Sequence, residues 1–290
     1  MKTPPTSVVL RNITTIYLFT HSDYKTIFFP VVLHPSYDLA TAHLFACQLF
    51  HAATWIWCHL LECNVSNQTF SAEEDIINKP WRPLPSGRID IRSARALRWF
   101  LMIFCLFLSI PFGRGVFCAS AALALVQIVH DDFGLSGHPI SKNLCNVGGY
   151  LTFEVGSTLV ISSGSSLDRT VLVALANSAL VIFTTIHAQD FADTEGDRMS
   201  GRQTLPIVAP EGSRIYILTA LFTWSFVLTR IWDLGPASGT IFIFMGALVG
   251  IRYFRFRDKI QDQLSFLFYS IWLFSAHLLP MNARGQVLAW

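Results

Sequence analysis

Long apolar stretches alternate with short polar connections along this chain. A stretch of roughly 20 mostly apolar residues can cross a bilayer as a helix. Pro30 and Pro35 interrupt the first stretch, and each proline bends or ends a helix because it lacks a backbone donor. The pattern predicts nine membrane-spanning helices: Tyr24–Leu39, Thr41–Cys63, Ala94–Phe112, Gly115–His130, Leu144–Ser162, Leu167–His187, Arg214–Trp232, Ala237–Phe254 and Gln261–Leu279.

Basic residues are distributed unequally between the two sets of connections. The connections on one side, together with their adjoining helix ends, hold only Arg114, Arg169 and Arg230. Because basic residues favour the cytosolic side, we expect the N-terminus in the cytosol, with residues 1–23 as a cytosolic segment and 24–290 as one transmembrane domain. The opposite connections hold Lys79, Arg82, Arg88, Arg92, Arg95, Arg98, Lys142, Arg198, Arg202, Arg214, Arg252, Arg255, Arg257 and Lys259.

Composition agrees with a membrane protein. Of the 290 residues, 52% are hydrophobic and 14% are charged, whereas soluble domains carry about 25% charged residues. A net charge of +2 gives no sign of a nucleic-acid-binding protein. The six cysteines fall mostly in apolar stretches without metal-ligand spacing and are typical of small core residues. We therefore predict an all-α polytopic bundle.

A block of carboxylates follows the sixth predicted span. Asp190, Asp193 and Asp197 are three and four residues apart, which puts them on one face if the segment is helical. Three like charges so close together would repel one another. Mg²⁺ would relieve this repulsion, since it binds hard oxygen ligands together with substrate phosphates. The alternative is a solvated acidic helix end that Arg198 and Arg202 neutralise.

A second polar block follows the second predicted span. Asn67, Ser71 and Asp75 share one face of a helix, and Glu74 flanks it. Three prolines stiffen the basic segment that comes next, which suits a preformed anion site; the alternative is that its cations only set the topology. The cations that could bind phosphate oxygens there are Lys79, Arg82 and Arg88.

Further polar residues lie around the fourth connection. His130-Asp131-Asp132 ends one predicted span, and Lys142 lies just before the next, which holds Tyr150 and Glu154. Lys142 could contact a diphosphate, and Tyr150 or Glu154 could face a cavity. Helix capping and hydrogen bonds between helices explain these residues equally well.

Both polar blocks follow helices that leave the membrane on the same side, four spans apart. This placement indicates two similarly oriented halves that face each other across a cavity. Aromatic residues make up 13% of the chain and could line such a cavity and stabilise carbocations. Lipid contact and packing are the alternative for any one of them.

At these two blocks the chain resembles the UbiA superfamily of intramembrane prenyltransferases. Asp190-x-x-Asp193-x-x-x-Asp197 matches the second motif of the family, and the run from Asn78 to Arg88 is similar to the stretch after the first motif. The first motif itself departs from the pattern Asn-Asp-x-x-Asp-x-x-x-Asp. The aligned residues here are Asn67, Gln68, Ser71 and Asp75, so two aspartates are missing and Glu74 partly compensates.

The altered first motif looks like that of a fungal branch of the superfamily, which includes membrane-bound terpene cyclases. The resemblance implies Mg²⁺ as cofactor, farnesyl diphosphate as substrate and a sesquiterpene hydrocarbon as product. It implies Asp75, Asp190, Asp193 and Asp197 as catalytic residues, with Asn67 and Glu74 as additional metal ligands. The implied diphosphate-binding residues are Asn67, Lys79, Arg82, Arg88, Lys142, Arg198 and Arg202.

Two other functions remain open from the sequence. A UbiA-type prenyltransferase would transfer the allylic cation to an aromatic or other acceptor. An ion-coupled transporter would place its ionisable residues near the bilayer midplane, whereas these clusters lie at helix ends. We expect the lipid bilayer, in the endoplasmic reticulum, and an isoprenyl diphosphate as partners, without an obligate protein partner or nucleic acid.

Overall fold

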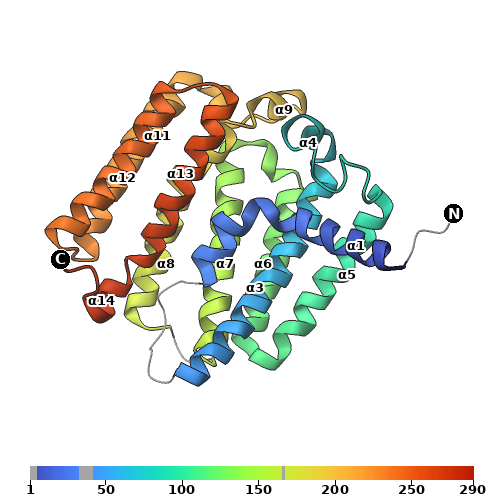
Figure 1. The fold of residues 1–290 in the computed structure, drawn as a ribbon, viewed down its shortest axis with the longest axis horizontal. Coiled ribbons are helices and arrows are strands. Elements are labelled where there is room, and N and C mark those ends of the chain that lie inside the picture. Colours follow the sequence, from blue (N-terminus) through green and yellow to red (C-terminus); the bar gives the residue numbers. More distant parts are fainter. Residues whose placement is uncertain (1–4, 33–41, 165–166) are drawn as a thin grey trace.

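A computed structural model describes residues 5–32, 42–164 and 167–290. These residues form helices joined by turns, and no strand occurs among them (Figure 1). The short 3-10 or π segments that matter below are η1 (His21–Asp23), η2 (Tyr24–Phe28) and η5 (Ile186–Asp190). The α-helices are α1 Pro5–Thr20, α2 Phe29–Val32, α3 Ala42–Phe70, α4 Ala72–Asn78, α5 Ile91–Ser109, α6 Arg114–Asp131, α7 Pro139–Ile161, α8 Arg169–Thr185, α9 Thr194–Met199, α10 Leu205–Val208, α11 Pro210–Ile231, α12 Pro236–Arg255, α13 Lys259–Leu278 and α14 Met281–Gly285.

Long apolar helices confirm the predicted all-α membrane bundle. Among the described residues, six helical segments are long and apolar enough to cross a membrane. Several begin at side chains that satisfy the free backbone N–H groups of a first turn: Asp90 caps α5, Asp168 caps α8 and Asp258 caps α13. The six segments are Ile91–Phe112, Pro139–Ile161, Arg169–Asp190, Pro210–Ile231, Pro236–Arg255 and Lys259–Gly285.

The predicted spans from Ala94–Phe112 onward each coincide with one helix, α5 to α8 and α11 to α13. The predicted span Thr41–Cys63 is too short, because α3 continues to Phe70. The predicted span Tyr24–Leu39 is described as far as Val32, and residues 33–39 lie outside the described residues. The total of nine membrane spans stays a prediction.

Small residues let α11 and α12 pack closely. A Cβ on Gly246 would lie 2.0 Å from Ser225 Oγ, and one on Gly250 would lie 2.9 Å from Leu218 Cα. Glycine four residues apart on one face is the pattern that brings membrane helices together. The two helices therefore form a tight pair at one side of the bundle (Figure 1).

Buried apolar side chains form two large clusters. One is built mainly by α8, α11, α12 and α13 around Trp272 and Tyr269. The other is built mainly by α3, α6 and α7 around Trp55 and Ile56. A cavity lined by residues from both clusters, hereafter the central cavity, separates them. This arrangement agrees with two halves that face each other across a cavity.

The two polar blocks meet at one end of the bundle, where Figure 1 shows α4 beside α9. Neither block is one continuous helix, so the condition under which its carboxylates would share one helical face is not met. The first block bends at Ser71 between α3 and α4. In the second, η5 ends at Asp190, a turn follows, and α9 begins at Thr194. The three aspartates therefore do not share a single helical face.

The N-terminal segment packs against the bundle. Figure 1 shows α1 crossing in front of α3 and α5, and the Phe19 carbonyl accepts a hydrogen bond from Gln68 Nε2 of α3 at 3.0 Å. Its continuation through η1 and η2 reaches the wall of the central cavity. The cytosolic location expected for residues 1–23 stays a prediction.

Candidate active site

The central cavity has a volume of about 690 Å³. This size falls within the range of small-molecule sites, roughly 300–1,000 Å³. The cavity has polar residues around α4 and α9 and apolar residues along the helices of the bundle. The polar residues include Asn67, Glu74, Lys79, Arg82, Lys142, Asp190, Asp193, Asp197 and Arg202; the apolar ones include Ile27, Phe29, Leu60, Leu123, Phe153, Ile186 and Phe266.

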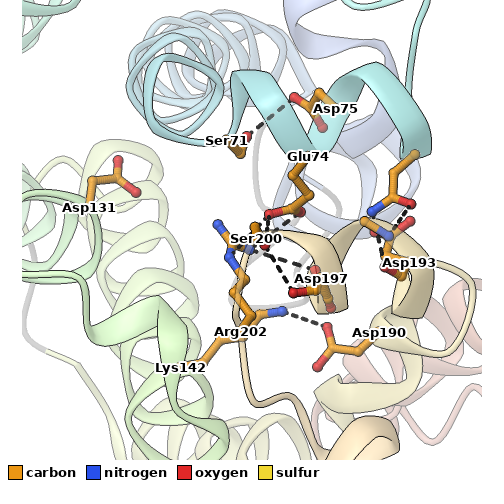
Figure 2. A network of polar contacts seen from close by, with 12 residues as sticks. Ser71, Glu74, Asp75, Asp131, Lys142, Asp190, Asp193, Asp197, Ser200 and Arg202 are labelled. Atoms are coloured by element: carbon orange, nitrogen blue, oxygen red, sulfur yellow. Dashed lines mark hydrogen bonds and ion pairs between the residues drawn. The ribbon is translucent and has the colours of Figure 1, made fainter.

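The second acidic block contacts cationic side chains that come from distant parts of the chain. Lys142 Nζ, near the start of α7, donates to Asp190 Oδ1 at 2.7 Å (Figure 2). Lys79 Nζ, just after α4, donates to Asp193 Oδ2 at 2.5 Å. All these side chains line the central cavity. The two lysines therefore neutralise these carboxylates in the structure, and each could exchange its carboxylate partner for a phosphate oxygen.

The first block behaves differently at its two carboxylates. Glu74 lines the cavity and its Oε2 lies 3.1 Å from Arg202 Nε, so it links α4 to the chain after α9. Asp75 is fully buried and lies outside the cavity lining. Arg82 Nη1 donates to both Asp75 oxygens at 2.9 Å. Asp75 thus fixes Arg82, which does line the cavity; a metal-ligand role for Asp75 stays a prediction and would require Arg82 to release it.

An asparagine joins the two blocks. Asn78 Nδ2 donates to the Asp193 carbonyl at 3.0 Å, and Asn78 Oδ1 accepts from the Gly196 backbone N–H at 3.3 Å. A Cβ on Gly196 would lie 2.4 Å from Asn78 Nδ2, so only glycine allows this approach. The contact sets the spacing of α4 and α9, and with it the distance between the two sets of carboxylates.

The carboxylates differ in how readily they ionise. Burial raises the pKa of Glu74 to about 7, and Arg202 only partly opposes this shift. Burial also opposes ionisation of Asp193, but Lys79, together with Lys142 and Arg82, outweighs it and holds the pKa of Asp193 below its usual value. Asp193 is therefore charged at neutral pH, whereas Glu74 changes its protonation state close to neutrality.

The donor atoms at this end of the cavity fit Mg²⁺. They are carboxylate and amide oxygens, which this hard cation prefers. Among the described residues, Asp197 Oδ2 is a buried oxygen without a hydrogen-bond partner, and its other oxygen lies 4.0 Å from Arg202 Nη1. No three His, Cys, Asp or Glu side chains within the described residues already form a metal cluster. Metal binding would therefore require carboxylates to leave their present cation partners.

Besides Asp75, three further candidates from the sequence lie outside the cavity lining. Arg88 is half-buried in the connection after α4, and its carbonyl accepts from Arg11. Arg198 is exposed on α9. Glu154, which was expected as a possible cavity residue, is buried between helices, where its Oε1 accepts from Ser178 and contacts His277. Tyr150, the alternative to it, does line the cavity.

Sequence reasoning missed the contribution of the N-terminal segment. Asp23 and Lys25 line the central cavity from η1 and η2, and Lys25 Nζ lies 5.0 Å from the centre of the Phe266 ring. The sequence feature that could have indicated these cavity residues is a pair of opposite charges at the start of a short apolar stretch that prolines interrupt. His130 and Gln127 of α6 also line the cavity, although the polar end of α6 was considered only as one of several lesser candidates.

Comparison with curated proteins gives two relatives that span almost the whole chain and a third that spans about half of it. Fumagillin β-trans-bergamotene synthase of Aspergillus fumigatus is 30% identical over 281 residues, 94% of each chain. A diterpene cyclase of Hericium erinaceus is 28% identical over 279 residues, 90% of this chain and 86% of the relative. Digeranylgeranylglyceryl phosphate synthase of Methanosarcina mazei is 34% identical over 165 residues, 54% of each chain. Both cyclases and transferases are thus among the relatives.

Solved structures share the fold at low sequence identity. A UbiA homologue from Archaeoglobus fulgidus, bound to DMAPP and Mg²⁺, superposes with a TM-score of 0.62 at 10% identity, covering 92% of this chain and 99% of the homologue. A structure of digeranylgeranylglyceryl phosphate synthase gives 0.60 at 18% identity, with 93% and 99% covered. The family model for UbiA prenyltransferases matches residues 28–272. The chain therefore belongs to the UbiA prenyltransferase family.

Proposed function

We propose that this membrane enzyme is a Mg²⁺-dependent class I terpene cyclase. It ionises farnesyl diphosphate and cyclises the resulting cation to a sesquiterpene hydrocarbon. We further propose that it lies in the endoplasmic reticulum membrane with the polar end of the central cavity open to the cytosol, as the distribution of basic residues favours.

The single observation that carries the proposal is that one cavity combines two kinds of wall. Carboxylates and cations from α4, α7 and α9 surround its polar end, and apolar side chains such as Leu60, Leu123 and Phe153 continue the same space into the bundle. A prenyl diphosphate has the same two parts, an anionic head and an apolar tail. The molecule and the cavity are complementary along their length.

The relatives support the choice of a cyclase over a transferase. The bergamotene synthase and the diterpene cyclase each align over nine-tenths of this chain. The first block also departs from the transferase motif at Gln68 and Ser71. Mg²⁺ is supported by the oxygen donors of the site and by its presence in the fold relative that was solved with DMAPP.

Cationic side chains bind the diphosphate in the proposed mechanism. Lys79, Lys142 and Arg202 leave their carboxylate partners and donate hydrogen bonds to the phosphate oxygens, while Arg82 remains oriented by Asp75. The carboxylates that they release, Glu74 among them, and the side-chain amide oxygen of Asn67 would be the oxygen donors available to Mg²⁺, which when bound would supply positive charge to neutralise the departing diphosphate.

The apolar part of the cavity protects the allylic cation. Side chains such as Phe153 and Phe266 exclude water, which would otherwise capture the cation as an alcohol. Aromatic faces offer favourable electrostatics to a positive charge that has no counterion nearby. The shape of this wall selects the fold of the prenyl chain and so the ring that forms.

Product analysis without an acceptor tests the proposal. Vesicles containing the purified protein are incubated with farnesyl or geranylgeranyl diphosphate, with Mg²⁺ or with EDTA, and the headspace and extract are analysed by gas chromatography and mass spectrometry. A cyclic hydrocarbon that depends on Mg²⁺ and on farnesyl diphosphate is expected. Asp193→Asn should abolish it, whereas Glu211→Gln, at an exposed ion pair outside the cavity lining, should not. A product that forms only with an added aromatic acceptor would establish a prenyltransferase instead.

A further inference from the structure

A histidine–aspartate pair lies at the end of α6, and the proposed ionisation step does not use it. His130 lines the central cavity. Its Nδ1 lies 2.7 Å from Oδ1 of Asp131, which is buried to 99% of its side chain. His130 itself keeps 16% of its side chain exposed. The pair therefore connects a shielded carboxylate to an imidazole at the cavity wall.

The surroundings of Asp131 decide which nitrogen of His130 carries the proton. Oδ2 of Asp131 accepts from Ser66 Oγ at 2.6 Å and from the Gln127 side-chain amide. A carboxyl group that accepts two such hydrogen bonds besides the histidine contact is favoured as a carboxylate. A carboxylate can only accept, so Nδ1 of His130 must donate to it. In the neutral imidazole Nε2 then carries a lone pair, and it has no hydrogen-bond partner among the residues that the structure describes.

The position of this lone pair is distinct from that of the acidic blocks. Cys63, Asn64 and Gln127, which line the cavity along α3 and α6 together with His130, are uncharged. In Figure 2, Asp131 stands apart from Asp193, on the other side of the Glu74–Arg202 pair. His130 thus lies on the wall of the cavity, and it forms no ion pair with the carboxylates that would hold the metal.

Resting on the cyclase function proposed above, we propose that His130 is the catalytic base that ends the cyclisation. Its Nε2 lone pair takes a proton from a carbon next to the cationic centre. The electrons of the broken C–H bond form the new C=C bond and remove the positive charge. The imidazolium that results is balanced by Asp131, and its proton passes to pyrophosphate or water when the product leaves. The overall reaction gives hydrocarbon, pyrophosphate and one proton, and Asp131 serves as a positioning residue.

The test separates ionisation from proton removal. Wild type, His130→Gln and His130→Phe are compared in vesicles with farnesyl diphosphate and Mg²⁺. Pyrophosphate release reports ionisation, and the product mixture reports the base. Removing a general base slows proton transfer by roughly 10²–10⁴-fold. We therefore expect pyrophosphate release within about threefold of wild type, whereas the share of the main hydrocarbon should fall at least about tenfold in favour of other alkenes and alcohols.

Two further variants make the test specific. Asp131→Asn keeps the size of the side chain but offers Nδ1 a neutral partner, so it should shift the product mixture in the same direction by a smaller factor, and Asp131→Glu should restore part of the wild-type mixture. His138→Gln, at the N-terminal cap of α7 and outside the cavity, should leave the mixture unchanged.

An unchanged product mixture in both His130 variants would overturn the proposal. Loss of pyrophosphate release in variants that keep the wild-type melting temperature would also overturn it, because His130 would then act on the diphosphate. Failure of the cyclase function is recognised separately, in the wild type: if it releases pyrophosphate only with an added acceptor, the function and the base that rests on it are both rejected.

Discussion

Replacing Asp75 by Asn distinguishes a residue that positions Arg82 from one that binds metal. The side chains of Asp75 and Arg82 are 1% and 9% exposed, and both Asp75 oxygens accept from Arg82. Ser71 Oγ also donates to Asp75 Oδ2 at 3.2 Å. Asp75→Asn leaves the shape nearly unchanged but leaves the buried guanidinium without its carboxylate.

The expected loss of stability is large. Removing one partner of a buried ion pair costs about 3–5 kcal/mol, since the remaining charge is left unpaired in a medium of low polarity. For a chain of this size each kcal/mol corresponds to roughly 2–4 °C, so the melting temperature should fall by roughly 6–20 °C. Replacing both residues, as Asp75→Asn with Arg82→Gln, removes the unpaired charge and should recover part of this loss.

Thermal unfolding in detergent measures the effect, with Glu211→Gln as the matched control. Glu211 pairs with Arg257 at the surface, where the two side chains are 68% and 44% exposed. An exposed pair of this kind contributes at most about 1 kcal/mol, so the control should change the melting temperature little. If Asp75→Asn keeps the wild-type melting temperature but loses activation by Mg²⁺, the structural reading is refuted and Asp75 is a metal ligand.

Three further predictions follow from the contacts at the cavity. Gly196→Ala places a Cβ against Asn78 and should cost about 1–3 kcal/mol of stability by overpacking. The control is Gly212→Ala, whose added Cβ meets its nearest neighbour at 3.6 Å. Equal melting temperatures for the two variants would contradict the prediction. Because the pKa of Glu74 is raised to about 7, protons compete with metal below that pH, and the apparent affinity for Mg²⁺ should fall by up to about tenfold per pH unit from pH 7 downward. In Glu74→Gln the affinity for Mg²⁺ should not change with pH near pH 7. The same pH dependence in both proteins would disprove Glu74 as a metal ligand. Lys142→Gln removes a charge-assisted hydrogen bond worth about 1.5–3 kcal/mol, so the KM for the diphosphate should rise by roughly 10- to 100-fold; an unchanged KM would remove Lys142 from the diphosphate site.

The membrane helices could be predicted from the sequence because a bilayer allows few alternatives. Every backbone group inside the hydrocarbon must be satisfied within its own segment, so an apolar stretch of sufficient length has to be a helix. The stretches that became α5 to α8 and α11 to α13 follow this rule closely. The prediction is least accurate near Phe70, because α3 continues beyond the predicted end of its span at Cys63.

The geometry of the acidic blocks could not be predicted in the same way. Spacing alone places Asp190, Asp193 and Asp197 on one helical face, but the segment bends because contacts from elsewhere decide its path. Lys142 binds Asp190 across 48 positions of sequence, and Lys79 binds Asp193 across 114. Such pairings are tertiary contacts, and one sequence gives no signal for them.

The altered first motif has a physical explanation in the position of the N-terminal segment. Where the family pattern has aspartate, Gln68 is fully buried and donates from Nε2 to the carbonyl of Phe19. A carboxylate at this position could only accept, so it would face the carbonyl oxygen without a proton between them.

The amide therefore does what an aspartate could not: it attaches the end of α1 to α3. The chain then continues into η1 and η2, which place Asp23 and Lys25 on the wall of the central cavity. The glutamine that replaces a potential metal ligand thus helps to place Asp23 and Lys25 on the cavity wall. A cyclase needs such a wall more than a transferase does, because it must enclose its cation until the ring has formed and the proton has left.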